Sequence, residues 1–145
     1  MSNKKFKWNK ELIQKYINTH QLEQLNKKDS NTITGFIWAC INNDKLAKFM
    51  LEKDNIDFNI QDQYGETGFM RICEYHPQLL FYILENKTIN KKINKNLKNV
   101  DNETGWDLAC AYNSTSFQIY KNYLQKEKIE NNLSDMKKNV KKNIL

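Results

Sequence analysis

Cys73 and His76 are the two residues whose types and spacing could do covalent chemistry. A thiol and an imidazole three residues apart can approach each other, and this pairing activates cysteine nucleophiles. However, His76 directly precedes Pro77, as at the start of a helix, and Cys73 is one of three evenly placed cysteines. The sequence contains no glycine-rich phosphate loop and no HExxH or GxSxG motif. We therefore expect no catalytic residue, no cofactor and no metal site, and the sequence does not indicate an enzyme.

The cysteines belong to three copies of one short pattern. Each copy opens with Thr, Gly and an aromatic residue and has a cysteine five residues after the glycine: Thr34–Cys40, Thr67–Cys73 and Thr104–Cys110. The glycines are 33 and 37 residues apart, a period typical of helical repeats that stack on one another. The odd number of cysteines and the absence of CxxC spacing argue against a disulfide framework or a zinc site. All three cysteines are predicted to be small apolar residues in equivalent buried positions.

The pattern resembles the ankyrin repeat, in which a turn of the form Asp-x-x-Gly-x-Thr-Pro-Leu-His-x-Ala leads into two antiparallel helices. Copy two (Asp62–Ile72) carries the pattern best. The other copies keep Asp29, Thr34, Phe36 and Ala39, and Thr104, Trp106 and Ala109, respectively. Three departures stand out: glycine replaces the proline in every copy, the histidine is absent, and Arg71 stands where an apolar residue is usual. The resemblance implies an all-α, ankyrin-like helical solenoid of about three full repeats with helical caps.

The chain divides into N-terminal capping helices (1–28), ankyrin-like repeats (29–124) and a C-terminal amphipathic helical tail (125–145). The apolar spacing predicts helices over 8–18, 20–27, 35–42, 44–53, 68–75, 77–86 and 105–112, and a longer one from about 115. Four extra residues lie between copies two and three, within 86–99, as a loop or a lengthened helix. Leu80, Phe81, Ile83 and Leu84 are predicted to form a buried face. Asp29, Asp57 and Asp62 are predicted to cap turns at the repeat junctions.

The resemblance also implies a partner-binding face made of hairpin tips and the exposed side of each first helix. The matching positions are Ser30, Asn31, Ile33, Ile41, Asn42, Gln63, Tyr64, Glu66, Glu74, Tyr75, Asp101, Glu103 and Tyr112. The tyrosines are of the type that contributes strongly to protein interfaces, and the carboxylates favour a basic protein partner. The alternative is that these are ordinary solvated loop residues.

The net charge of +6 invites a nucleic-acid interpretation, but Arg71 is the single arginine among 23 basic residues. Lysine lacks the planar fork that reads phosphates and guanine edges, so nucleic acid is not the expected partner. Lys, Asn and Ile make up 57 of the 145 residues, and all three have A/T-rich codons. This composition indicates an A/T-rich genome such as that of a large DNA virus, a protist or an intracellular bacterium.

The tail carries an apolar stripe, because Ile129, Leu133, Met136, Val140 and Ile144 recur every three or four residues. Three interpretations remain open. The stripe packs back over the last repeat, it pairs with another helix (including self-association through residues 129–145), or it forms a Lys-rich helix that binds nucleic acid or an anionic membrane.

No apolar run long enough for a transmembrane segment or a secretory signal is present. We therefore predict an intracellular, cytoplasmic protein, in the host cytoplasm if it is viral or an effector. The predicted function is that of a non-catalytic protein–protein interaction module, an adaptor or a host-interaction protein. Lys-rich binding through the C-terminal helix is the alternative.

Overall fold

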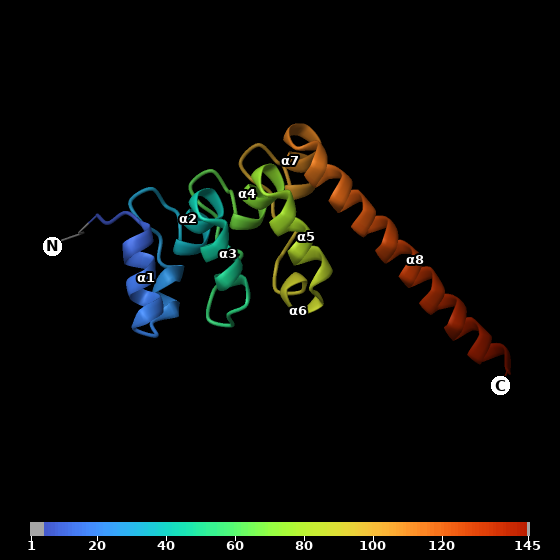
Figure 1. The fold of residues 1–145 in the computed structure, drawn as a ribbon. Coiled ribbons are helices and arrows are strands. Elements are labelled where there is room, and N and C mark those ends of the chain that lie inside the picture. Colours follow the sequence, from blue (N-terminus) through green and yellow to red (C-terminus); the bar gives the residue numbers. More distant parts are fainter. Residues whose placement is uncertain (1–4, 145) are drawn as a thin grey trace.

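The computed structural model describes residues 5–144, which form eight α-helices and one 3-10 helix and contain no strand, so the predicted all-α class is confirmed. Residues 1–4 of the predicted N-terminal cap and residue 145 of the tail lie outside the described range. The elements are α1 (Lys10–Asn18), η1 (Leu22–Asn26), α2 (Gly35–Asn42), α3 (Asp44–Leu51), α4 (Gly68–Tyr75), α5 (Pro77–Glu85), α6 (Lys87–Asn90), α7 (Gly105–Tyr112) and α8 (Ser114–Ile144). Figure 1 shows α2, α4 and α7 following one another along the molecule, with α8 running away from them.

Each copy begins its first helix in the same way. The hydroxyl groups of Thr34, Thr67 and Thr104 accept hydrogen bonds from the backbone N–H three residues later, at 3.2, 3.2 and 3.3 Å. This is the N-cap arrangement that satisfies a free donor in the first helical turn. The boundaries of α2, α4 and α7 therefore coincide with the predicted 35–42, 68–75 and 105–112.

Glycine opens these helices because consecutive copies approach too closely for a side chain. A methyl group at Gly68 would lie 2.4 Å from Cε2 of Phe36, and one at Gly105 would lie 2.8 Å from Sγ of Cys73. The contacts run from α2 to α4 and from α4 to α7. Glycine in place of the proline of the ankyrin pattern is thus a requirement of close helix packing at these positions.

The turns before the first helices are equivalent as well. Asp29, Asp62 and Asn99 are buried, and Oδ1 of each accepts hydrogen bonds from the backbone N–H groups two and four residues later. Three residues after each of these, Thr32, Gly65 and Asn102 have φ values of 66°, 74° and 63°. Asp29 and Asp62 therefore cap junction turns as predicted. Asp57 accepts from the N–H of Asn59 in the loop before copy two.

Other predictions need correction. Phe81 is exposed, and Leu79 takes its predicted place in the core. Residues 22–26 form a 3-10 helix where an ordinary helix was predicted. Trp8 precedes α1, where its backbone N–H donates to Asp29 Oδ2 at 3.0 Å and its ring N–H donates to the Lys27 carbonyl.

The cysteines are not equivalent in burial. Cys40 and Cys73 are buried, and the glycine that opens the next copy, Gly68 or Gly105, lies against each of them, but Cys110 is exposed. Within residues 5–144 no fourth copy follows to cover α7. The predicted burial is therefore correct for two cysteines and wrong for the third.

This difference predicts the thiol reactivity of the folded protein. We expect iodoacetamide to alkylate Cys110 in the native state, whereas Cys40 and Cys73 react only on unfolding, since burial raises their pKa well above the ordinary value. Mass spectrometry of the intact protein before and after denaturation measures the number of modified thiols. Rapid native modification of two or three thiols would contradict the packing between copies.

The segment between copies two and three forms the short helix α6 followed by turns that lead to Asn99. Its polar contacts tie it to its neighbours. Asn59 and Asn94 are joined through Asn94 N–H and Asn59 Oδ1 at 2.8 Å, and Lys92 pairs with Asp54 at 2.7 Å. The four extra residues are thus absorbed below the hairpin tips, on the side of the molecule where α6 lies (Figure 1).

Candidate functional site: the groove between copies two and three

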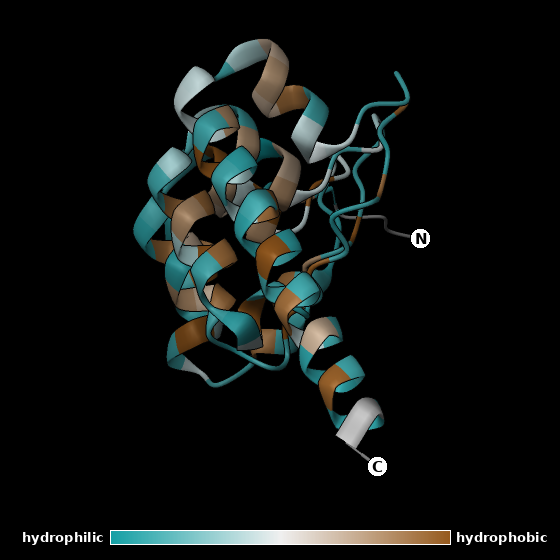
Figure 2. Cartoon of the chain, turned by 90° about the vertical axis from the view of Figure 1, so that its right-hand side faces the viewer, coloured by the Kyte–Doolittle hydropathy of each residue, from teal (hydrophilic) through white to brown (hydrophobic). Residues whose placement is uncertain are grey.

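A hollow of about 380 Å³ lies where the tips of copies two and three meet the exposed sides of α4 and α7. We call it the groove. Its lining residues are Tyr64, Glu66, Arg71, Glu74, Tyr75, Asn99, Val100, Asp101, Glu103, Leu108 and Tyr112. In Figure 2 the tips protrude to the right as mostly hydrophilic loops.

The groove gathers seven of the thirteen sequence-predicted positions: Tyr64, Glu66, Glu74, Tyr75, Asp101, Glu103 and Tyr112. The remaining six, Ser30, Asn31, Ile33, Ile41, Asn42 and Gln63, do not line it. Five of these six belong to copy one, and there they either stay exposed or, as with Ile33, lie half-buried. The predicted face therefore divides into positions that line the hollow between copies two and three and positions outside it, most of them on copy one.

Three aromatic side chains are exposed around the groove. Tyr64, Tyr75 and Tyr112 have exposed fractions of 58%, 58% and 64%, which are high for residues of their size. Tyr64 lies in the tip of copy two, Tyr75 is the last residue of α4, and Tyr112 is the last residue of α7. A tyrosine presents a large contact area and a hydroxyl group with only two side-chain torsions to fix.

Arg71 is one of four groove residues that the sequence did not indicate as binding positions. Its guanidinium lies 3.3 Å from Asp62 Oδ2 and 3.3 Å from Glu66 Oε1, and the side chain is 22% exposed. The signal was present, since Arg71 is the single arginine and occupies a position that is usually apolar. It joins the buried turn aspartate to a groove carboxylate and so holds Glu66 in place.

Asn99, Val100 and Leu108 were also missed. The Asn99 side chain donates to Glu66 Oε2 at 2.9 Å and to Glu103 Oε1 at 3.2 Å, and the N–H of Val100 donates to the Tyr64 carbonyl at 2.9 Å. These bonds connect the tip of copy three with that of copy two. The groove wall is therefore a hydrogen-bonded unit with little freedom to rearrange.

The electrostatic character of the groove is acidic. Glu66, Glu74, Asp101 and Glu103 face a single cation, Arg71, which is already paired with two carboxylates. The charge of Glu74, together with partial burial, raises the pKa of Tyr75 above its ordinary value. The phenol thus stays neutral at physiological pH and remains a hydrogen-bond donor.

Cys73 and His76 do not form a nucleophilic site. Cys73 is completely buried under Gly105, and burial raises the pKa of its thiol well above the ordinary value. His76 lies at the junction of α4 and α5, with Nδ1 3.8 Å from Asp44 Oδ1. A neutral, enclosed thiol cannot attack a substrate.

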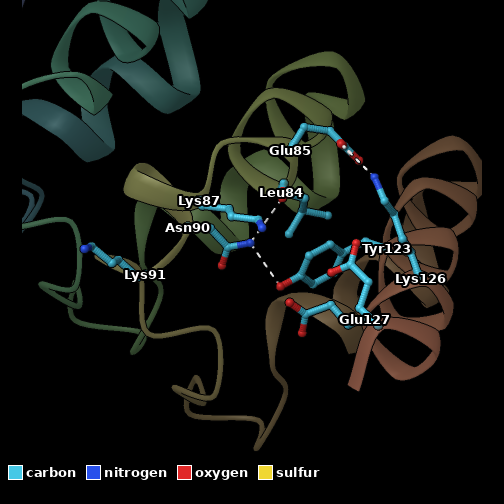
Figure 3. Close-up of a pocket in the computed structure, with 9 residues that line it drawn as sticks. Leu84, Glu85, Lys87, Asn90, Lys91, Tyr123, Lys126 and Glu127 are labelled. Atoms are coloured by element: carbon cyan, nitrogen blue, oxygen red, sulfur yellow. Dashed lines mark hydrogen bonds and ion pairs between the residues drawn. The ribbon is translucent and has the colours of Figure 1, made fainter. Parts of the chain in front are cut away.

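A second hollow, of about 450 Å³, lies between α5, α6 and α8. Figure 3 shows Asn90 of α6 directed toward Tyr123 of α8, to whose hydroxyl it donates at 3.0 Å, and Lys126 paired with Glu85 at 3.5 Å. The charged residues around it are three lysines and three glutamates: Lys87, Lys91, Lys126, Glu85, Glu127 and Glu130. Because the positive and negative charges balance, the hollow does not favour a ligand of either sign. The contacts hold α8 against α5 and α6.

The first part of α8 belongs to the packed body, and the rest leaves it. Ser116 and Tyr120 are buried, whereas Ile129, Leu133, Met136 and Val140 have exposed fractions of 50–61%. The interpretation that the stripe packs back over the last repeat is therefore wrong for these four residues. The helix is continuous from Ser114 to Ile144, so the predicted boundary at 124/125 lies inside it.

Among the residues that the structure describes, no helix combines the length and the apolar character needed to cross a membrane.

Comparison with known proteins bears on the fold alone. No family model matches the sequence, and none of the curated proteins compared with it matches. One chain in the solved complex of the predatory endopeptidase Bd0816 from Bdellovibrio bacteriovorus with the immunity protein Bd3460 is similar in structure, with a TM-score of 0.54 and 23% sequence identity. The match covers 77% of this chain and 56% of that one. The present chain therefore spans little more than half the length of the solved chain.

Proposed function

We propose that the chain is an ankyrin-like repeat protein that binds a basic segment of a partner protein in the groove. The observation that carries the proposal is the grouping of three exposed tyrosines with four carboxylates on adjoining copies. The equivalent N-caps, turn residues and glycine contacts support an ankyrin-like solenoid as its frame.

The chemistry of the groove indicates the kind of partner. Lysine or arginine side chains can meet Glu74, Asp101 and Glu103, and apolar side chains can pack on the tyrosine rings, which also attract cations. A phosphate backbone would be repelled by the same carboxylates. That the structurally similar chain comes from a complex of two proteins is in keeping with a protein partner.

The rigidity of the groove supports binding without a large ordering cost. The turns are held by Asp62 and Asn99, and the two tips share backbone and side-chain hydrogen bonds. Because little loop entropy is lost on association, a small interface can reach useful affinity. An adaptor or host-interaction role and a cytoplasmic location remain predictions from the sequence.

Selection of peptides from a random displayed library on the immobilised protein tests the proposal. We expect enriched peptides to combine Lys or Arg with an apolar or aromatic residue. The double variant Tyr64→Ala with Tyr75→Ala should weaken their binding by about 10- to 100-fold, the range of interface hot spots. Fluorescence anisotropy of the labelled peptides measures the affinities.

The matched control alters two predicted positions that lie outside the groove, Ser30→Ala with Asn42→Ala. This variant should retain affinity within about two-fold, as surface positions outside a binding site usually do. Equal loss in both double variants, or enrichment of acidic peptides, would contradict binding in the groove.

A further inference from the structure

The two ends of α8 have apolar faces that point in different directions. Ser116, Tyr120 and Tyr123 face the body, where Tyr120 contacts the rings of Phe69 and Trp106. Their spacing of four and three residues continues through Glu127. The stripe begins two residues later, about 200° around the helix. The body-facing side of α8 becomes polar at Glu127, and the apolar stripe lies on a different side of the helix. The stripe is therefore not directed at the repeats.

The stripe has the form of a seam between two helices. Ile129, Leu133, Met136 and Val140 follow one another at intervals of four, three and four residues, one side chain per turn. This is the a/d spacing of a two-helix contact and is narrower than the apolar face of a membrane-surface helix. Figure 2 shows hydrophobic segments along the projecting C-terminal end of α8.

The two flanks of the stripe differ in chemistry. One flank carries Glu130 and Lys137, seven residues apart, and the other carries Asn132 and Asn139, also seven apart. The flanks decide which helix fits, because flanking charges set partner choice and orientation in such pairs.

We propose that residues 129–140 of α8 pair with the same residues of a second copy of this chain, in antiparallel orientation. In this register Ile129 packs against Val140 of the second copy and Leu133 against its Met136. Glu130 then lies beside Lys137 of the second copy, and the symmetric pair forms on the same side. Asn132 lies beside Asn139 on the opposite flank.

A parallel pair is disfavoured by the same residues. Glu130 would lie beside Gln125 of the second copy and Lys137 beside its Asn132, so neither flank would contain an ion pair. In addition, Lys137, Lys138, Lys141 and Lys142 of both copies would gather at one end. The antiparallel pair separates these lysine groups and places the two helical bodies at opposite ends.

The expected dimer is weak and reversible. Four apolar side chains from each copy make a small interface by the standards of stable dimers. We therefore expect a dissociation constant in the micromolar range or above, measured by sedimentation equilibrium from low micromolar to millimolar protein.

Cysteine cross-linking tests the orientation, in a Cys110→Ser background so that exposed Cys110 does not react. A mixture of Ile129→Cys and Val140→Cys chains should form a mixed disulfide dimer under mild oxidation. Val140→Cys alone should not, because its two thiols would be separated by the rise of eleven residues, about 16 Å. Efficient linking of Val140→Cys to itself would show a parallel pair and overturn the proposal.

Charge exchange tests the flank. Glu130→Lys should raise the dissociation constant about five- to ten-fold, because two ion pairs become repulsive contacts. Adding Lys137→Glu to that variant should restore it. Leu133→Asp should abolish detectable dimer while the circular dichroism spectrum stays helical, and Lys138→Asp, on the opposite side of the helix, should leave the dimer intact.

A chain that stays monomeric at millimolar concentration overturns the proposal. In that case, binding of the monomer to phosphatidylserine vesicles or to duplex DNA would assign the helix to an anionic surface. The dimer and the groove are tested separately, because peptide binding in the groove is also measured with the Leu133→Asp variant, which should not dimerise.

Discussion

Replacing Gly68 with alanine is expected to lower the free energy of unfolding by about 3 kcal/mol, the upper part of the range for overpacked cores. The new methyl group would lie 2.4 Å from Cε2 of Phe36 and 2.7 Å from its Cδ2. The Phe36 ring is almost completely buried and packs edge-on against Phe58 at 4.9 Å between centroids, so it cannot withdraw. Urea denaturation followed by tryptophan fluorescence measures the loss.

Two further glycines provide a graded control. At Gly105 the nearest atom would be Cys73 Sγ at 2.8 Å, and at Gly35 it would be Leu25 Cβ at 3.1 Å. We therefore expect an order of effect Gly68, Gly105, Gly35. Gly35→Ala should stay within about 1 kcal/mol of the wild type, because alanine also reduces the entropy of the unfolded chain. Equal effects at all three positions would contradict close packing as the cause.

Removing the turn aspartate of copy two is the second large effect. Asp62→Ala is expected to cost about 3–4 kcal/mol, because it leaves two partly buried backbone N–H groups and the Arg71 guanidinium without this acceptor. Asp62 accepts from the N–H groups of Tyr64 and Glu66 at 2.8 and 2.9 Å and from Arg71 at 3.3 Å. Thermal and urea unfolding both report it.

Asp62→Asn separates the two roles of this side chain. Asn99 shows that an amide can hold the same turn, since its Oδ1 accepts the equivalent two hydrogen bonds. Asp62→Asn should therefore keep the turn and lose only the ion pair with Arg71, at about 1 kcal/mol. If the asparagine variant is as unstable as the alanine variant, the ion pair rather than the turn is the main contribution.

The helices of the repeats were predictable because their ends are decided locally. Thr34, Thr67 and Thr104 cap their helices through their own hydroxyl groups, and Pro77 stands at a first helical position where no donor is lost. The glycines were visible as a departure from the ankyrin pattern. The reason for the glycines was not visible, because it depends on side chains that lie against them, such as Phe36 and Cys40 for Gly68.

The predictions of burial were wrong where burial depends on a neighbouring element of the structure. Phe81 has the spacing of a core residue but lies on the outer side of α5, and Cys110 repeats the pattern of Cys40 without a following copy to cover it. The stripe was found by its period. Its direction could have been read from the two-residue shift between Glu127 and Ile129, since an amphipathic helix that continues one face keeps its phase.

The groove was only partly predictable from the sequence, because it too depends on contacts between copies. Positions chosen by resemblance to the ankyrin pattern included the tyrosines and carboxylates, but they did not distinguish copy one from the hollow between copies two and three. That hollow depends on Arg71 and Asn99, which act through Glu66 across two copies. The Asn99–Glu66 pair joins residues 33 positions apart, and local sequence spacing does not reveal such a contact.

The way in which the chain accommodates the four additional residues has a practical consequence for engineering. The tips remain joined by Val100 N–H and the Tyr64 carbonyl, whereas the extra length lies near Asn94 and exposed Asn96, which do not line the groove. A fluorophore or an affinity tag grafted there would report on the protein without altering the spacing of the loops that face a ligand.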